Sequence, residues 1–135
     1  MIGRIEEALG GSVDGKTIAV LGLTFKPNTD DMRDAPSLVI IPGLQEKGAA
    51  IRAYDPEGME EAAQLLQNVT YCEDAYDCMQ GSDAAVILTE WNQFRALDLH
   101  RMKELLTKPV LIDLRNIYPL EEVEGFDYHS IGRPM

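Results

Sequence analysis

Residues 17–37 read Thr-Ile-Ala-Val-Leu-Gly-Leu-Thr-Phe-Lys-Pro-Asn-Thr-Asp-Asp-Met-Arg-Asp-Ala-Pro-Ser, and this stretch decides the fold class. Its apolar beginning, residues 17–21, predicts a fully buried strand. A polar loop follows, and an apolar run with helical spacing begins near Ser37. A buried strand that opens into a polar loop before a helix is where α/β proteins place their ligands. The loop contains two fixed cations, Lys26 and Arg33, which indicate an anionic ligand, with phosphate as the first candidate.

The spacing of these two cations leaves two interpretations open. Lys26 could act as a point charge and Arg33 as a planar fork in a phosphate site built from side chains. Alternatively, both cations pair with the neighbouring acids Asp30, Asp31 and Asp34 and hold no ligand. The loop has neither a Gly-x-Gly-x-x-Gly pattern nor a Walker motif, so a glycine-rich backbone cradle for a pyrophosphate is not expected.

Length, charge and cysteine usage limit the class of protein. The 135 residues fit one domain, and the net charge of −11 argues against nucleic acid or an anionic membrane as partner. The spacing of Cys72 and Cys78 matches neither a redox motif nor a zinc ligand pair, so we expect free thiols and no metal. No stretch approaches the roughly 20 apolar residues of a membrane span, and the first residues have no apolar signal core. We therefore expect a cytoplasmic protein.

Apolar strands alternate with helical segments along the chain. Strands are predicted at 17–22, 50–54, 69–71, 84–88, 110–113 and 127–132. Helices are predicted at 1–9, 37–47, 57–67, 75–79 and 98–106, the second capped by Asp34 or Ser37 and kinked or split by Pro42. Because the central strands are apolar on both faces, the pattern predicts a Rossmann-like three-layer α/β sandwich with a mainly parallel central sheet.

Further candidate residues follow the later strands. Arg115, after the strand at 110–113, should lie on the same sheet edge as Lys26, where it could bind a phosphate or a base edge or else pair with Asp113. Trp91 and Phe94 could wall a ligand crevice or pack a helix onto the sheet.

Three other kinds of residue give weaker signals. Asp55 occupies the place of a ribose-binding acid, but without the glycine pattern this role is weakly supported. His100 and His129 have no convincing partners, so structural roles are favoured. No catalytic triad is evident, and neither cysteine has the cationic sequence context of a nucleophile.

Four runs considered together resemble one family: residues 22–33, 54–56, 89–91 and 113–116. They are similar to the C-terminal, nucleotide-sugar-binding domain of the UDP-glucose/GDP-mannose dehydrogenases, which oxidise their substrates twice to the uronic acid. The resemblance covers about Gly15 to the end and is closest to the bacterial UDP-glucose 6-dehydrogenase branch. It implies that Phe25 and Lys26 contact the UDP-sugar, with Lys26 at the phosphates. It also implies that Arg33 reaches NAD across an interdomain cleft, and that Arg115 binds the nucleotide.

The resemblance also implies parts that this chain lacks. Family members carry an NAD-binding Rossmann domain, a long connecting helix and a catalytic cysteine. We therefore expect residues 1–14 to be the remnant of a preceding helix or linker, and 15–135 to be the binding domain. The chain alone should contain no catalytic residue and be inactive, with NAD bound mainly by the missing domain and the parent enzyme a homo-oligomer. A GDP-mannose or UDP-N-acetylmannosamine dehydrogenase, or a non-catalytic nucleotide-binding module, remain the alternatives.

Overall fold

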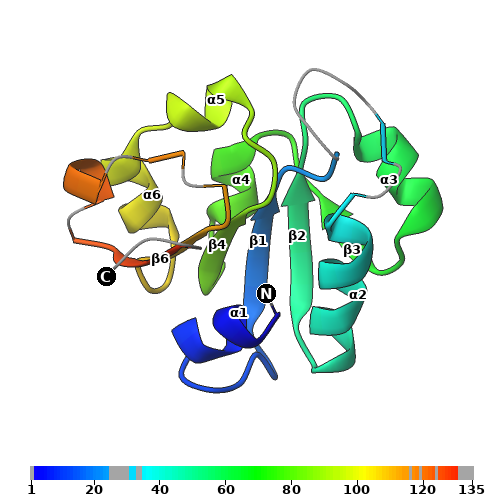
Figure 1. Cartoon of the computed structure of the whole chain (residues 1–135), viewed down its shortest axis with the longest axis horizontal. Helices are drawn as coiled ribbons and strands as arrows, with labels where there is room; N and C mark the ends of the chain where they lie inside the picture. Colours follow the sequence, from blue (N-terminus) through cyan, green and yellow to red (C-terminus); the bar gives the residue numbers. More distant parts are fainter. Residues whose placement is uncertain are drawn as a thin grey trace.

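A computed structural model describes residues 2–24, 31–32, 35–115, 117–118, 120–123 and 125–130. Six parallel strands form one sheet in the order β3-β2-β1-β4-β5-β6, as Figure 1 shows in part. The strands are β1 (Thr17–Leu21), β2 (Ala50–Tyr54), β3 (Val69–Tyr71), β4 (Ala84–Ile87), β5 (Val110–Asp113) and β6 (Asp127–Ser130). This is the strand order of the doubly wound dinucleotide-binding fold, so the predicted Rossmann-like class is confirmed.

Helices cover both faces of the sheet. One apolar cluster joins it to α1 (Ile2–Ala8), α2 (Ser37–Glu46) and α3 (Met59–Leu65). A second cluster joins the other face to α4 (Ala75–Met79), α5 (Asn92–Arg95), α6 (Leu99–Leu105) and the 3₁₀ helix η1 (Leu120–Val123). Successive β1 residues alternate between the clusters, since Ile18 and Val20 belong to the first, and Ala19 and Leu21 to the second. The strand is apolar throughout because both of its faces are buried.

The register brings the ends of the central strands to one level. Leu21, the last residue of β1, lies opposite Tyr54 of β2 and Ile87 of β4. The loops that follow these strands therefore leave the sheet side by side, at the upper edge in Figure 1. Among the described residues, no helix has the length and apolar character needed to cross a membrane.

For α2, one of the two effects predicted for Pro42 and one of the two predicted caps are wrong. Pro42 does not split the helix, which runs unbroken from Ser37 to Glu46 although Pro42 cannot donate a backbone hydrogen bond. Burial of Ile40 and Leu44 on either side holds the helix against the sheet. Ser37 does not cap the helix either, because its hydroxyl donates to the carbonyl oxygen of Leu23 at 2.6 Å.

The remaining helix predictions were mostly correct. The predicted end of α2 is confirmed at Lys47, with Gly48 at a φ of +97°. The structure also contains the one-turn helix α5 (Asn92–Arg95), where no helix was predicted.

Candidate functional site

The candidate site lies where β1 and β4 separate. These strands are neighbours in the sheet, but the chain leaves them toward helices on opposite faces. Ligands of open α/β sheets bind at such a switch point, outside the carboxyl ends of the strands. The loops 22–24 and 88–90 line it, and the start of the loop after β5 lies beside them, since Leu114 N donates to Ile87 O at 3.2 Å.

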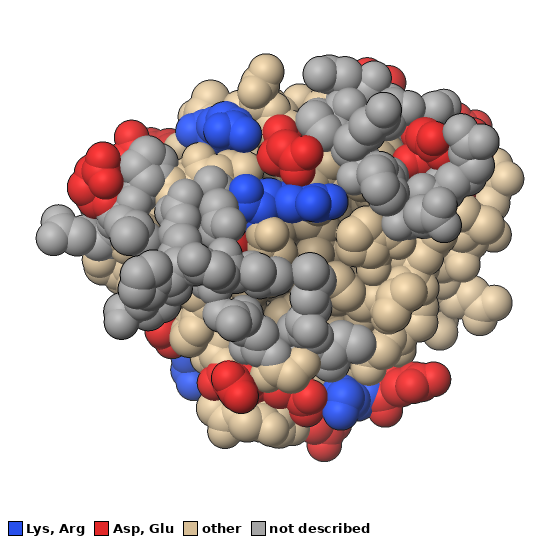
Figure 2. Space-filling view, in the orientation of Figure 1, with Lys and Arg blue, Asp and Glu red and all other residues tan. Residues whose placement is uncertain are grey.

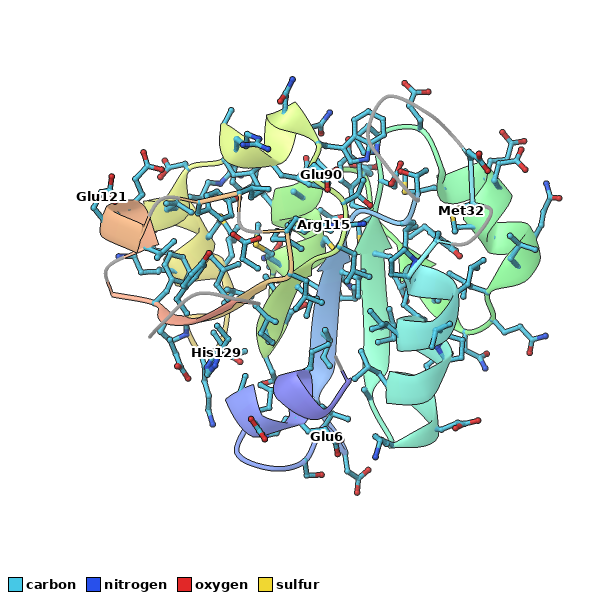
Figure 3. The ribbon with its side chains drawn as sticks, in the orientation of Figure 1. Glu6, Met32, Glu90, Arg115, Glu121 and His129 are labelled. Atoms are coloured by element: carbon cyan, nitrogen blue, oxygen red, sulfur yellow. The ribbon has the colours of Figure 1, made fainter. Side chains whose placement is uncertain are left out.

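Arg115 lies at this edge, beside Glu90 (Figure 3). Its Nε donates to the carbonyl oxygen of Leu88 at 2.8 Å and lies 3.2 Å from Oε2 of Glu90. The two side chains are 32% and 33% exposed, so the pair is accessible from solvent. Figure 2 shows basic side chains with an acidic group between them near the carboxyl ends of the central strands. A phosphate could therefore compete with Glu90 for the guanidinium.

Asp113 holds the backbone that carries Arg115. It is fully buried, and its carboxylate accepts the N–H of Arg115 at 3.1 Å, the N–H of Tyr118 at 3.1 Å and the hydroxyl of Tyr128 at 2.8 Å. Burial and the nearby Asp113 carboxylate raise the pKa of Tyr118, whose hydroxyl donates to the carbonyl oxygen of Phe94. Among the described contacts, the guanidinium of Arg115 pairs with Glu90, while Asp113 accepts the backbone N–H of Arg115. The predicted alternative, an ion pair between the Arg115 and Asp113 side chains, is therefore wrong.

Asp55, at the end of β2, is fully buried and faces the loop after β1. Its Oδ2 accepts hydrogen bonds from Leu23 N (2.7 Å), Thr24 N (3.1 Å), Thr24 Oγ1 (3.2 Å) and Trp91 Nε1 (3.3 Å). Its Oδ1 accepts from Glu57 N (2.9 Å) and Gly58 N (2.7 Å). A carboxylate offers about four lone-pair positions, so these donors fill both oxygens.

Thr89 joins the loops after β1 and β4. Its hydroxyl, fully buried, donates to the carbonyl oxygen of Thr24 at 2.7 Å. Gly22 makes this approach possible, since a Cβ there would lie 2.5 Å from the Cβ of Thr89. The Gly58 backbone also lies close, because a Cβ there would lie 2.4 Å from Cγ2 of Thr24. The described walls of the switch point are thus closely packed and hydrogen-bonded to one another.

Comparison with known proteins decides what this arrangement belongs to. The model of the UDP-glucose/GDP-mannose dehydrogenase family, UDP binding domain, matches residues 19–119. The chain belongs to this family. The matched range runs from within β1 to beyond β5 and contains Asp55, Thr89 and Arg115, so the resemblance predicted from the sequence is confirmed.

Individual relatives agree with the family. The chain is 53% identical over 133 residues to a UDP-glucose 6-dehydrogenase of Rhizobium meliloti, covering 97% of this chain and 30% of that protein. It is 52% identical over 127 residues to UDP-glucose 6-dehydrogenase TuaD of Bacillus subtilis, covering 92% and 28%. A solved UDP-glucose dehydrogenase from Pyrobaculum islandicum has a TM-score of 0.77 and 32% identity, covering 95% and 28%. The chain therefore spans less than a third of these relatives' length.

Within this family domain, the described residues do not form a dinucleotide site of the glycine-loop type. Gly22 is the only glycine in residues 17–37, and its positive φ serves the packing against Thr89. Asp55, at the place of a ribose-binding acid, is saturated by internal donors. A UDP binding domain with these features does not fit NAD in that mode.

The structure describes some of the predicted site residues and not others. Phe25, Lys26 and Arg33 lie outside the described residues, as do Asp30 and Asp34. Arg115 is placed at the expected edge of the sheet.

Trp91 and Phe94 are buried in the second apolar cluster, so of their two interpretations, packing is the correct one. His100 lies 3.1 Å from Glu104 and His129 lies 2.9 Å from Asp127, partners that the sequence did not indicate; the structural roles of the two histidines stay a prediction.

The sequence placed Thr89 and Glu90 in a run that resembles the family but gave neither residue a role of its own. Both lie within three residues of the end of β4, which is the signal that could have given them one. The sequence also placed Asp55 only in a weak ligand-binding role, although its position at a strand end was informative.

Proposed function

We propose that this chain is the UDP-sugar-binding part of an NAD-dependent UDP-glucose 6-dehydrogenase. The parent reaction would convert UDP-glucose, water and two NAD into UDP-glucuronate and two NADH, for polysaccharide biosynthesis. The observation that carries the proposal is Arg115, a partly exposed guanidinium beside the switch point of a matched UDP binding domain. Identity of more than half to bacterial UDP-glucose 6-dehydrogenases supports glucose as the sugar.

The proposed work of this chain is binding and orientation. Arg115 would exchange its contact with Glu90 for the nucleotide, and a planar guanidinium suits two parallel hydrogen bonds to a phosphate. Lys26 and Phe25 would contact the UDP-sugar, and Arg33 would face NAD held mainly by another domain. Cys72 and Cys78 are both buried in the second apolar cluster, Cys78 on α4 itself, and a buried thiol is poorly placed to act as a nucleophile. We therefore expect no turnover of UDP-glucose by this chain alone.

Two alternative functions have less support. The domain of a GDP-mannose or UDP-N-acetylmannosamine dehydrogenase would use the same fold with another base or sugar pocket. A non-catalytic nucleotide-binding module would share the site without an oxidoreductase partner. A homo-oligomeric parent enzyme also stays a prediction.

Calorimetric titration of this chain with UDP, GDP and NAD tests the proposal. We expect UDP to bind weakly but more tightly than the other two, and Arg115→Ala and Lys26→Ala each to weaken UDP binding by on the order of tenfold. Arg101→Ala is the control, because Arg101 lies on α6 over the ring of Tyr76, at 4.0 Å from its centroid. Equal or tighter binding of GDP would overturn the substrate assignment. Absence of UDP binding would overturn the claim that this chain holds the site by itself.

A further inference from the structure

Asp55 lies at the centre of the hydrogen bonds that shape the switch point. Its donors come from three segments far apart in the sequence: the loop after β1, the turn before α3 and the loop after β4. The side chain has no exposed surface. A buried carboxylate is stable only when it is well hydrogen-bonded, so these segments and the charge hold one another in place.

A series of contacts connects Asp55 to the partly exposed guanidinium of Arg115. Thr24 donates to Asp55, and the Thr24 carbonyl accepts the hydroxyl of Thr89. The next residue, Glu90, contacts Arg115, as does the carbonyl of Leu88. A continuous path of short contacts thus runs from the end of β2, across the ends of β1 and β4, to the side chain at the end of β5.

We propose that Asp55 is a positioning residue for the nucleotide site: it sets the loops after β1 and β4 in the arrangement that presents Arg115 to the ligand, and it does not touch the ligand itself. This inference rests on the proposed function. It replaces the role of a ribose-binding acid that the position of Asp55 suggests, because both carboxylate oxygens already accept internal donors.

The substitution Asp55→Asn tests this role. An amide of the same shape places an NH₂ group against buried N–H donors and removes the charge, so the loop after β1 must shift. We expect UDP affinity to fall at least tenfold at a temperature where the variant is folded. The matched control is Asp83→Asn, since Asp83 accepts Thr17 N (2.8 Å) and Thr107 Oγ1 (2.8 Å) at the opposite end of β1. It should lose thermal stability but keep UDP affinity within twofold.

A spectroscopic readout separates positioning from general destabilisation. The Nε–H resonance of Arg115 in a ¹H–¹⁵N spectrum should shift on addition of UDP in the original chain and in the Asp83→Asn variant. It should shift little in Asp55→Asn. If Asp55→Asn does not fold, Trp91→Phe removes the indole donor to Asp55, keeps an aromatic ring in the core and leaves the other donors in place, and should weaken UDP binding several-fold.

The outcomes distinguish this inference from the proposed function. The positioning role alone is overturned if a folded Asp55→Asn variant binds UDP like the original chain and shows the full Arg115 shift. If that variant does not fold, the same result for Trp91→Phe overturns the role. Failure of the unmodified chain to bind UDP overturns the proposed function of this chain, and the positioning role with it.

Discussion

Gly22 shows how one residue fixes the spacing of two loops. Its φ of +95° lies in the left-handed region, and a Cβ there would lie 2.5 Å from the Cβ and 2.6 Å from the backbone nitrogen of Thr89. The second contact is with backbone, which cannot rotate away as a flexible side chain can. Thr89 in turn donates to the carbonyl of Thr24. The close approach of the two loops therefore depends on the missing side chain.

Gly22→Ala should destabilise the protein more than the same substitution at an equally strained glycine elsewhere. We expect its free energy of unfolding to fall by about 2–4 kcal/mol, from backbone strain together with the clash on Thr89. Gly10→Ala is the control, because Gly10 has a φ of +89° but nothing lies within 4 Å of a Cβ there. It should cost about 1 kcal/mol, from strain alone. Urea unfolding monitored by the fluorescence of Trp91 measures both, and equal losses would contradict the role of the clash.

At the scale of elements, α4 is attached to the sheet by polar contacts as well as by packing. Arg52 on β2 donates from Nε to the carbonyl of Cys78 at 3.2 Å and from Nη2 to the carbonyl of Asp77 at 2.9 Å. These carbonyls belong to the last turn of α4, where cations are favourable. The thiol of Cys78 on α4 donates to the carbonyl of Val20 on β1 at 4.0 Å, and that of Cys72, just after β3, donates to the carbonyl of Thr70 at 3.7 Å.

This thiol pair should titrate unevenly. The neighbouring Cys78 side chain lowers the pKa of Cys72 to about 7 from its ordinary value of 9.0, despite its burial, and the nearby Arg52 acts in the same direction. The neighbouring Cys72 side chain and burial raise the pKa of Cys78. Thiolate absorbance at 240 nm should therefore rise with a midpoint near pH 7, and Cys78→Ala should move this midpoint upward.

The same shifts determine how stability depends on pH. Between about pH 7 and 9 the unfolded chain keeps the Cys72 proton and the folded chain releases it, so this group increases the free energy of unfolding as pH rises. Above about pH 9 Cys78 has the opposite effect, because the unfolded thiol ionises first. The Cys72→Ala variant is the control and should lack the increase. A midpoint near pH 9 in the original chain would contradict the predicted effect of Cys78 on the pKa of Cys72.

The elements also show what the sequence could and could not predict. The strands were predictable because runs such as 84–87 are buried on both faces and therefore apolar throughout. The four-residue helix α5 was not predictable, because it is too short to show a helical period. The unbroken course of α2 was not predictable either, because burial of the residues around Pro42 outweighs the penalty of a proline inside a helix. Arg115 was predictable from its position after a strand. The donors to Asp55 from the loops after β1 and β4 were not, because they lie 31 to 36 residues away in the sequence and are assembled only by the fold.

At the scale of the whole molecule, the proposed anion site lies within a strongly acidic protein. The 23 acidic and 12 basic side chains give a net charge of −11. The strand order gathers the loops after β1, β4 and β5 at one edge, so that one guanidinium can act locally even though the net field repels anions. At 0.1 M salt the Debye length is about 10 Å, so contacts at hydrogen-bond distance survive while the longer-range repulsion is screened.

The excess negative charge predicts a salt dependence of folding stability. Self-repulsion destabilises the compact state more than the expanded unfolded chain, and salt screens it. Ion pairs such as Lys47–Glu6 at 3.3 Å and Arg52–Asp77 at 3.6 Å are partly exposed and weak, so their loss on screening should be smaller. Raising NaCl from 10 to 300 mM at pH 7.5 should therefore increase the free energy of unfolding by on the order of 1 kcal/mol. The internal control is the same series near pH 4.5, where the net charge passes through zero and the increase should vanish. A decrease with salt at pH 7.5 would mean that local ion pairs outweigh the net charge, and the acidic surface would then stabilise the fold.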